Sequence, residues 1–538
     1  MTGLAIDYGT LLPALIPIGG AVLVLVADLV RPSLRQPPYV IAVLAILGAT
    51  AATIPGLAQA PGDAQATLCV EPTGQAVGSG TLQTGVEGLP QTCFWQADSL
   101  TSSLQLGAGV AALIVVLLAW PRARARAAAD GTREPIEAIL FLVSFAGTVV
   151  VAASRDLGTW LIALEIATLP VIGLVALRGG RGAVAGAVQL LVTSLVSFAL
   201  LVLGAALWLV ATGTPMLDAN AALLGQGYHV ESAGPASVAF PDTSTAILGL
   251  AVVLIIAGLA FKLSLVPFHA WTPTAYSGAT VPVATFLATV SKIGALAALL
   301  VVLRAVSVLG ASALGAIALL AALSMTVGNI MALRQNDVVR LLAWSTVAQA
   351  GWVVLPLVSV SPLGNRASGI YLLTYVAATV VAFAVVALTV RERSGSGRSL
   401  ESYEGLWRRS PWRAGALGLA LMSLAGLPPG IIGLVGKIVA LRPVVVEGWI
   451  WLAVIAAANA VLGVAVYLRW LRPVVTTAEV TGAPEPAETT QTTQTTRTRR
   501  AAARGPGNRR IIIAGLVISS ALLAVVSVQP DVLLRLFG

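Results

Sequence analysis

The sequence predicts an all-α integral membrane protein with about 14 transmembrane helices, and three observations support this fold class. Of the 538 residues, 57% are hydrophobic and only 10% are charged, whereas soluble domains carry roughly 25% charged residues. A single soluble core stops growing near ~250–300 residues, so apolar surface on this scale needs lipid as its solvent. The apolar residues are also gathered into runs long enough to cross a bilayer, which takes ~20 residues of helix.

The predicted spans fall between polar loops along the whole chain. They are 11–30, 38–58, 99–120, 135–153, 157–177, 184–212, 245–277, 280–304, 310–333, 338–358, 367–390, 412–441, 448–471 and 511–529. No basic region precedes the first run, so we expect a spanning helix there and not a signal peptide. The runs 245–277 and 412–441 are long enough to contain a break.

The arginines predict the orientation of these helices. If the N-terminus lies outside, the arginine-rich loops fall on the inner side, and the outer side has only Arg155, Arg304, Arg366, Arg442 and Arg535. Inner loops of membrane proteins carry such an excess of basic residues. Both chain termini are therefore expected on the outer side. Because the formal net charge of +9 comes from these loops, nucleic-acid binding is not expected.

We expect five sections along the chain. Residues 1–133 hold helices 1–3 and a long outer loop, 134–306 a first five-helix repeat (helices 4–8), and 307–472 a second five-helix repeat (helices 9–13). The two repeats are predicted to be inverted relative to each other. The Thr-rich segment 473–510 reads as a disordered inner linker, and 511–538 contains the final helix.

The two cysteines, Cys69 and Cys93, lie in one polar loop that is predicted to be outside. A disulfide can persist there, and the sequence leaves a bridged and a free pair equally open. No CxxC pair or Cys/His cluster is present, so neither an iron–sulfur cluster nor a metal site is expected in this chain.

The chain has three lysines, Lys262, Lys292 and Lys437, and all three lie inside apolar runs. The polar loops use arginine instead. Arginine stays protonated almost everywhere, whereas a buried lysine can lose its proton near neutral pH. A carboxylate beside such a lysine opposes the loss. A buried lysine with a movable acidic partner is therefore a proton switch.

Glu165 is the candidate partner, because it lies in the middle of the fifth predicted span. A charge inside a membrane costs at least ~2.5–3.5 kcal/mol and usually marks a functional site. The alternative is a static ion pair that locks two helices together. Three buried lysines and a buried glutamate, with no lysine elsewhere, favour proton transfer over that alternative.

Prolines interrupt two of the spans that carry lysines. Pro267 follows Lys262 by five residues, and Pro428 and Pro429 precede Lys437. Proline removes a backbone donor and breaks a helix, and irregular backbone survives in a membrane only when it is buried or lines a wet cavity. Helices 7 and 12 are therefore predicted to be broken at matching places of two inverted repeats. An ordinary proline kink is the alternative for each position.

Several segments carry a resemblance to a known family. They are FKLSLVPFHAWTPTAYSGATVPVATFLATVSK at 261–292, GNIMALRQNDVVRLLAWSTVAQAGWVVL at 328–355, SLESYEGLWRRSPW at 399–412 and LALMSLAGLPPGIIGLVGK at 419–437. They resemble the antiporter-like membrane subunits of respiratory complex I, which are related to multisubunit sodium/proton antiporters. The resemblance runs from about Glu134 to Trp470, and these motifs together are highly specific.

This resemblance implies roles for the buried charges. Glu165 becomes the partner acid, Lys262 the switching lysine, Lys292 the central relay and Lys437 the terminal proton-transfer lysine. For His269, hydration of the broken helix and simple packing are both open. A lysine in the twelfth span resembles subunit N of the family and not subunit M, and the long lateral helix of subunit L is absent.

The sequence departs from the family pattern at several polar positions. Ala185 and Gln189 stand where the sixth helix of relatives often has charges, and Gln349 stands where many relatives have histidine. Thr274 and Ser277 replace a further polar pair. These departures leave fewer charged or titratable groups between the lysines than the family pattern has. They leave open the route of proton transfer, and they also leave open that this chain is a diverged second copy of subunit N.

The expected function is proton translocation as a membrane subunit of NADH:quinone oxidoreductase in a bacterial cell membrane. The resemblance implies that other complex I subunits are the partners and that NADH, FMN, iron–sulfur clusters and a quinone belong to the whole complex. The composition points weakly to menaquinone, and no cofactor is expected on this chain. A cation/proton antiporter subunit and a non-pumping paralogue of subunit N are the alternatives.

Overall fold

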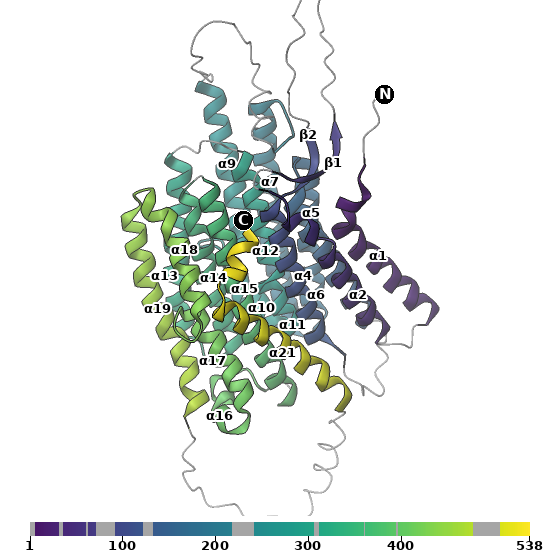
Figure 1. Ribbon diagram of the computed structural model, residues 1–538, viewed down its shortest axis with the longest axis vertical. Helices are drawn as coiled ribbons and strands as arrows, with labels where there is room; N and C mark the ends of the chain where they lie inside the picture. The colour runs from purple at the N-terminus through teal and green to yellow at the C-terminus, as the bar shows by residue number, and fades with distance from the viewer. Residues whose placement is uncertain are drawn as a thin grey trace, which may run out of the picture.

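The computed structural model describes residues 6–31, 36–60, 63–70, 92–121, 133–217, 242–305, 311–359, 361–393, 396–476 and 506–537. It is a bundle of long helices, with a small β-hairpin at one end and the short helix α16 at the other (Figure 1). Most of the linker predicted at 473–510 lies outside the described residues. The flanking helices extend to Val475 and begin again at Pro506, so they overlap the two ends of the predicted segment.

The first helices of the chain pack beside the rest of the bundle. They are α1 (Tyr8–Val30), α2 (Pro37–Ala51), α3 (Ile54–Leu57) and α4 (Ser99–Ala119). Aspartates begin two of them, since Asp7 accepts a hydrogen bond from the Gly9 amide and Asp98 from the Thr101 amide. Such caps satisfy donors that the first helical turn leaves unpaired.

The next block contains two interrupted spans. Its helices are α5 (Arg133–Ala153), α6 (Leu157–Ala176), α7 (Arg181–Thr212), α9 (Asp242–Leu263), α10 (Trp271–Gly278), α11 (Val281–Ala288) and α12 (Val290–Ala305). The predicted span 245–277 is divided between α9 and α10, as its proline suggested. The predicted span 280–304 is also divided, at Thr289, and this break was not predicted.

The second block also contains an interrupted span. Its elements are α13 (Ala311–Leu333), α14 (Val338–Val354), η1 (Leu355–Val358), α15 (Pro362–Glu392), η2 (Leu400–Tyr403), α16 (Leu406–Arg409), α17 (Pro411–Ala425), α18 (Ile431–Val446) and α19 (Ile450–Val475). The predicted span 412–441 consists of α17 and α18, with Gly426 in the left-handed conformation (φ 79°) at the break. The inverted relation of the two blocks stays a prediction.

The last helices return to the body of the bundle. They are α21 (Pro506–Val528), α22 (Asp531–Leu534) and η3 (Arg535–Phe537). α21 runs obliquely across α15 and α4 (Figure 1). The hydroxyl of Ser103 on α4 donates to the Leu536 carbonyl oxygen, which fixes the end of the chain against the bundle.

Thirteen helices in the described part of the chain are long and apolar enough to cross a membrane, and they match thirteen of the fourteen predicted spans. The remaining predicted span, 412–441, is divided into α17 and α18, which have 15 and 16 residues. The prediction of an all-α multi-pass membrane protein is therefore confirmed. α12, α14 and α15 are almost fully enclosed, whereas α1, α2, α7 and α19 leave much of their apolar surface exposed, as lipid contact requires.

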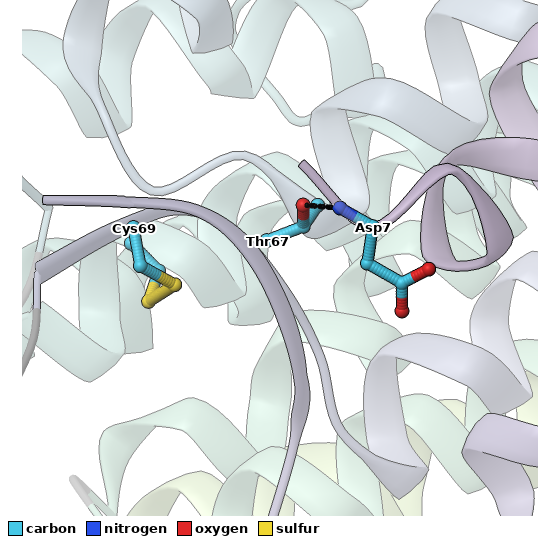
Figure 2. The surroundings of a disulfide bond; sticks show 4 residues. Asp7, Thr67 and Cys69 are labelled. Carbon is cyan, nitrogen blue, oxygen red and sulfur yellow. Dashed lines mark hydrogen bonds between the residues drawn. A yellow bond between two sulfur atoms is a disulfide. The ribbon is translucent and has the colours of Figure 1, made fainter. Parts of the chain in front are cut away.

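A two-stranded antiparallel hairpin caps one end of the bundle. Its strands are β1 (Gln65–Val70) and β2 (Thr92–Ala97), and Cys69 is the pairing partner of Cys93. The two cysteines form a disulfide (Figure 2). The hairpin is tied to the start of α1, because the Asp7 amide donates to the Thr67 hydroxyl over 2.8 Å (Figure 2). The strands on both sides of the long predicted loop are thus fixed to the bundle, β1 through Thr67 and β2 through the Phe94 carbonyl, which accepts from the Arg155 amide.

The disulfide leads to a first prediction. In SDS, the purified chain should bind no maleimide-linked polyethylene glycol until it is reduced, and two labels per chain afterwards, because its two cysteines are joined. A gel-shift assay measures this. The Cys93→Ser variant is the matched control and should take one label without reduction. Labelling of the unreduced native chain would contradict the disulfide.

Candidate functional site

An ion pair between two helices lies inside the bundle. Lys262, near the end of α9, donates through Nζ to Oε1 of Glu165 on α6 over 2.8 Å. The two side chains are only 7% and 15% exposed. The same ammonium donates to the hydroxyls of Thr168 (3.1 Å) and Ser194 (3.0 Å). All three ammonium protons therefore have acceptors, which a buried charge requires.

A small cavity adjoins the Lys262 ammonium. Thr168, Thr193, Ser194 and Ser291 supply hydroxyls to its wall, and its volume is ≈ 20 Å³. A space of this size can hold about one water molecule. The cavity therefore offers a place for water beside Lys262.

The break after α9 provides acceptors for neighbouring side chains. Ser264 has a left-handed φ of 67°, and the helix ends before Pro267. Because the last turn of a helix leaves carbonyl oxygens unpaired, they can bind other donors. The Phe261 carbonyl accepts from Trp271 Nε1 over 2.9 Å, and the Lys262 carbonyl accepts from Nζ of Lys292 over 2.8 Å. The backbone of one lysine thus contacts the ammonium of the next.

Lys292 lies on α12 and is 2% exposed. Besides the Lys262 carbonyl, its ammonium donates to the hydroxyl of Ser264 over 2.6 Å, which in turn accepts from the Thr272 hydroxyl. It also lies 4.7 Å from the centre of the Trp271 ring, a cation–π distance. Within the described residues Lys292 has no ion pair. Neutral acceptors alone hold its charge.

The unpredicted break at Thr289 sets the position of Lys292. The Lys292 amide donates to the carbonyl of Thr289 instead of that of Ala288, so the Ala288 carbonyl is free for the Tyr375 hydroxyl, at 3.0 Å. The sequence did contain a signal. Thr285 and Thr289 both return hydrogen bonds from their hydroxyls to the preceding turn, and such bonds bend helices.

Lys437 lies on α18, beyond the second proline break, and is 6% exposed. Its ammonium donates to the carbonyl of Ala425, at the end of α17, over 2.6 Å. It also lies 5.6 Å from the centre of the Trp352 ring. Within the described residues Lys437 has no ion pair either. The second half of the bundle therefore repeats the lysine at a helix break but not the partner acid.

The remaining predicted positions differ in how closely they contact the lysines. Gln349 on α14 donates to the Tyr467 hydroxyl over 2.9 Å and accepts from the Tyr371 hydroxyl, deep in the bundle. His269 packs against the Trp344 ring with centroids 5.1 Å apart and has no hydrogen bond to a lysine among the described contacts. A role for His269 in hydration stays a prediction.

Two of the departures from the family pattern join α7 to α10. Gln189 donates to the Ala270 carbonyl over 3.0 Å and accepts from the Thr274 hydroxyl over 2.5 Å. Ala185 is exposed on α7. The carbonyl of Ser277 accepts from both Arg178 and Arg398. Neutral polar contacts therefore hold the first half of α10 in place, and arginines hold its end.

These features define a class of protein. Apolar helices cross the membrane many times, and buried lysines lie at three interrupted spans. Carbonyls that the breaks leave free hold two of these lysines. Intramembrane ionisable groups on broken helices are typical of transporters of ions or protons.

Comparison with known proteins identifies the family. Residues 154–463 match the family described as "NADH:quinone oxidoreductase/Mrp antiporter, TM". A relative from Salinispora tropica, named NADH-quinone oxidoreductase subunit N, is 38% identical over 476 residues, which are 86% of this chain and 84% of that protein. A second, from Streptomyces griseus, is named NADH-quinone oxidoreductase subunit N 2 and is 35% identical over 96% of this chain and 92% of that protein.

Solved structures agree with this assignment. A chain of respiratory complex I from Thermus thermophilus is 28% identical, with a TM-score of 0.69 over 97% of this chain and 98% of that chain. A chain of the Mrp complex from Dietzia is 19% identical, with a TM-score of 0.74 over 99% of this chain and 96% of that chain, and supports the fold. The chain belongs to the NADH:quinone oxidoreductase/Mrp antiporter transmembrane family, within its subunit N group.

The close approach of α18 to α17 leads to a second prediction. A Cβ at Gly433 would overlap the carbonyl oxygen of Ser423, so Gly433→Ala must push the start of α18 away. We expect a loss of about 3 kcal/mol, as for overpacked cores, and a lower midpoint of thermal unfolding. Gly415→Ala on α17 is the matched control, because no atom lies within 4 Å of its added Cβ. Equal midpoints for the two variants would contradict the packing at this break.

Proposed function

We propose that this chain is a proton-translocating membrane subunit of NADH:quinone oxidoreductase. Its membership of the subunit N group supports the assignment to that complex. One observation carries the proposed chemistry. Lys262 contacts the carboxylate of Glu165 through its ammonium and the ammonium of Lys292 through its backbone carbonyl.

In the proposed cycle, Glu165 controls how firmly Lys262 holds its proton. While the pair is closed, the carboxylate stabilises the charged ammonium at 2.8 Å. A signal from neighbouring subunits separates the pair, and the buried charge then lacks its counter-ion, which is unfavourable in a membrane interior. The proton moves to Lys292 and from there to Lys437. Closure of the pair reloads Lys262, and the adjoining cavity supports its access to water.

The neutral environments of Lys292 and Lys437 suit them to pass a proton on. Each ammonium is held by backbone carbonyls, a hydroxyl or an aromatic ring and by no described carboxylate. Such acceptors stabilise the charged form less than a carboxylate does. Both lysines can therefore exist without their proton. Two five-helix repeats, 134–306 and 307–472, are proposed to frame this path.

Redox chemistry is proposed to occur in other subunits of the complex. This chain has two cysteines, both in the disulfide, so no thiolate remains for an iron–sulfur cluster. NADH, FMN, iron–sulfur clusters and the quinone, with menaquinone as candidate, would belong to the whole assembly. The partners are then the other membrane subunits of complex I, especially neighbouring antiporter-like subunits.

The third prediction concerns the ion pair. Lys262→Ala and Glu165→Ala should each abolish coupled proton pumping while the complex still assembles, because each removes one side of the proposed switch. Pumping is measured as NADH-driven acidification of vesicles that contain the purified complex. Glu401→Ala is the control, since this carboxylate is exposed on the inner loop of the predicted topology. Unchanged pumping in both ion-pair variants would rule the scheme out.

The same vesicles separate this function from the alternatives. Sodium-dependent proton exchange in vesicles without NADH would identify a cation/proton antiporter instead. Normal assembly and normal pumping in Lys437→Ala would identify a non-pumping paralogue.

The fourth prediction concerns orientation in a bacterial cell membrane. The arginine distribution supports a chain with both termini on the outer side. A protease-cleavable tag fused after Gly538 should therefore be removed by protease added to spheroplasts. A tag inserted near Gln491, in the predicted inner linker, should resist the protease until the membrane is lysed. The reverse pattern would invert the proposed topology.

A further inference from the structure

The helix that carries Glu165 has two opposite faces with different neighbours. Glu165 and Thr168 share one face of α6, and both contact the Lys262 ammonium. The opposite face contacts α5 and consists of residues three and four apart in the sequence, Ala163, Ile166 and Ala167. α5 therefore supports α6 directly behind the acid of the ion pair.

Gly147 is the residue of α5 that meets the backbone of α6. A Cβ at this position would lie closer than 3.0 Å to three backbone atoms, a separation that real Cβ atoms do not show. These atoms are the amide nitrogen of Ala167, the carbonyl carbon of Ile166 and the carbonyl oxygen of Ala163. Backbone atoms cannot rotate away as the end of a side chain can. Only a residue without a Cβ therefore allows this spacing.

Ser144, one turn earlier on α5, holds α6 at the same place. Its buried hydroxyl donates to the carbonyl oxygen of Ala167 over 2.5 Å. α6 has a weak point here, because Pro170 lies inside the helix and has no amide hydrogen for the carbonyl of Ile166. The hydrogen bond from α5 thus fixes α6 where its own hydrogen bonding is incomplete, close to Glu165.

α5 itself is fixed, whereas α6 lies at the edge of the bundle. Gln105 on α4 donates to the Val149 carbonyl of α5 over 3.0 Å. Thr148 packs against α12, where a Cβ on Gly294 would lie 3.2 Å from its hydroxyl oxygen. On α6, by contrast, Ile162 is 63% exposed. Because an enclosed helix in a close-packed interior cannot yield, crowding between α5 and α6 would move α6.

We propose that Gly147 and Ser144 are positioning residues that set the distance between the Glu165 carboxylate and the Lys262 ammonium. This inference rests on the proposed function. Gly147 lets α6 lie directly against α5, and Ser144 fixes α6 along the length of α5. Neither residue touches the proton that is transferred, and both act through the backbone of α6. A side chain at position 147 would push α6 toward Lys262, since the two contacts lie on opposite faces of the helix.

The test combines Gly147→Ala with Glu165→Asp in the assembled complex. The first change moves α6 toward Lys262, and the second withdraws the carboxylate by one methylene. Each single variant should lower NADH-driven proton pumping about tenfold or more, because a misplacement of about 1 Å can cost ~100-fold in rate. The double variant should recover pumping, since the two changes oppose each other. A packing role alone would not be rescued by a shorter acid.

Two matched controls accompany these variants. Gly173→Ala lies between the same two helices, but its added Cβ would meet only the end of the Leu140 side chain, at 3.2 Å. Ser144→Ala removes the second contact without adding volume and should also slow pumping. Its control is Ser103→Ala, because this buried hydroxyl donates to the Leu536 carbonyl, away from the ion pair. Both controls should pump normally, and subunit content reports assembly separately.

The outcomes separate this inference from the proposed function. Normal pumping in Gly147→Ala or in Glu165→Asp would overturn the inference, as would a double variant that pumps no better than the single ones. If Gly147→Ala does not assemble, equal pumping in Ser144→Ala and Ser103→Ala would overturn it. Normal pumping in both Lys262→Ala and Glu165→Ala would instead refute the proposed function itself.

Discussion

The structure depends on acceptors for three ammonium groups that have been taken out of water. A charge in a membrane interior is stable only when polar groups replace its hydration, and most of an apolar bundle has none to offer. Lys262 uses a carboxylate and two hydroxyls, whereas Lys292 and Lys437 use backbone carbonyls and aromatic rings. Two of the three ammonium groups are therefore held by a carbonyl that a helix break leaves free.

Interrupted helices are the source of those carbonyls. In an intact helix each carbonyl is bound within its own chain, so only a break can release one without leaving an unpaired donor in lipid. The break after α9 provides the Lys262 carbonyl to Lys292, and the break after α17 provides the Ala425 carbonyl to Lys437. The break at Thr289 frees the Ala288 carbonyl for the Tyr375 hydroxyl. The two half-helices at the last break, α17 and α18, pack closely against each other, because Gly430 and Gly433 leave room for the backbone at Ser423. The sites of Lys292 and Lys437 therefore depend on the helix breaks beside them.

The two halves of the bundle hold their charges differently. The first half has a carboxylate, hydroxyls and a cavity beside Lys262, which suit a site that loads and releases a proton. The second half has a lysine with neutral neighbours and a network of hydroxyls centred on Gln349. A buried amide orients hydrogen bonds but does not exchange protons near neutral pH. The two halves therefore differ in whether a carboxylate accompanies the buried lysine.

Composition and patterning determined the fold class, the spans, the buried lysines and the breaks at Pro267 and Pro428, because these depend on hydropathy and on single residues with fixed backbone effects. The sequence could name Glu165 as a partner for Lys262 but could not measure the contact. Thr285 and Thr289 were a sequence signal for the break at Thr289, but only the tertiary structure located it. The tertiary structure alone joined the disulfide and placed the Lys437 ammonium near the Trp352 ring. Each depends on which atoms of distant segments meet, and periodicity along one helix carries no information about that.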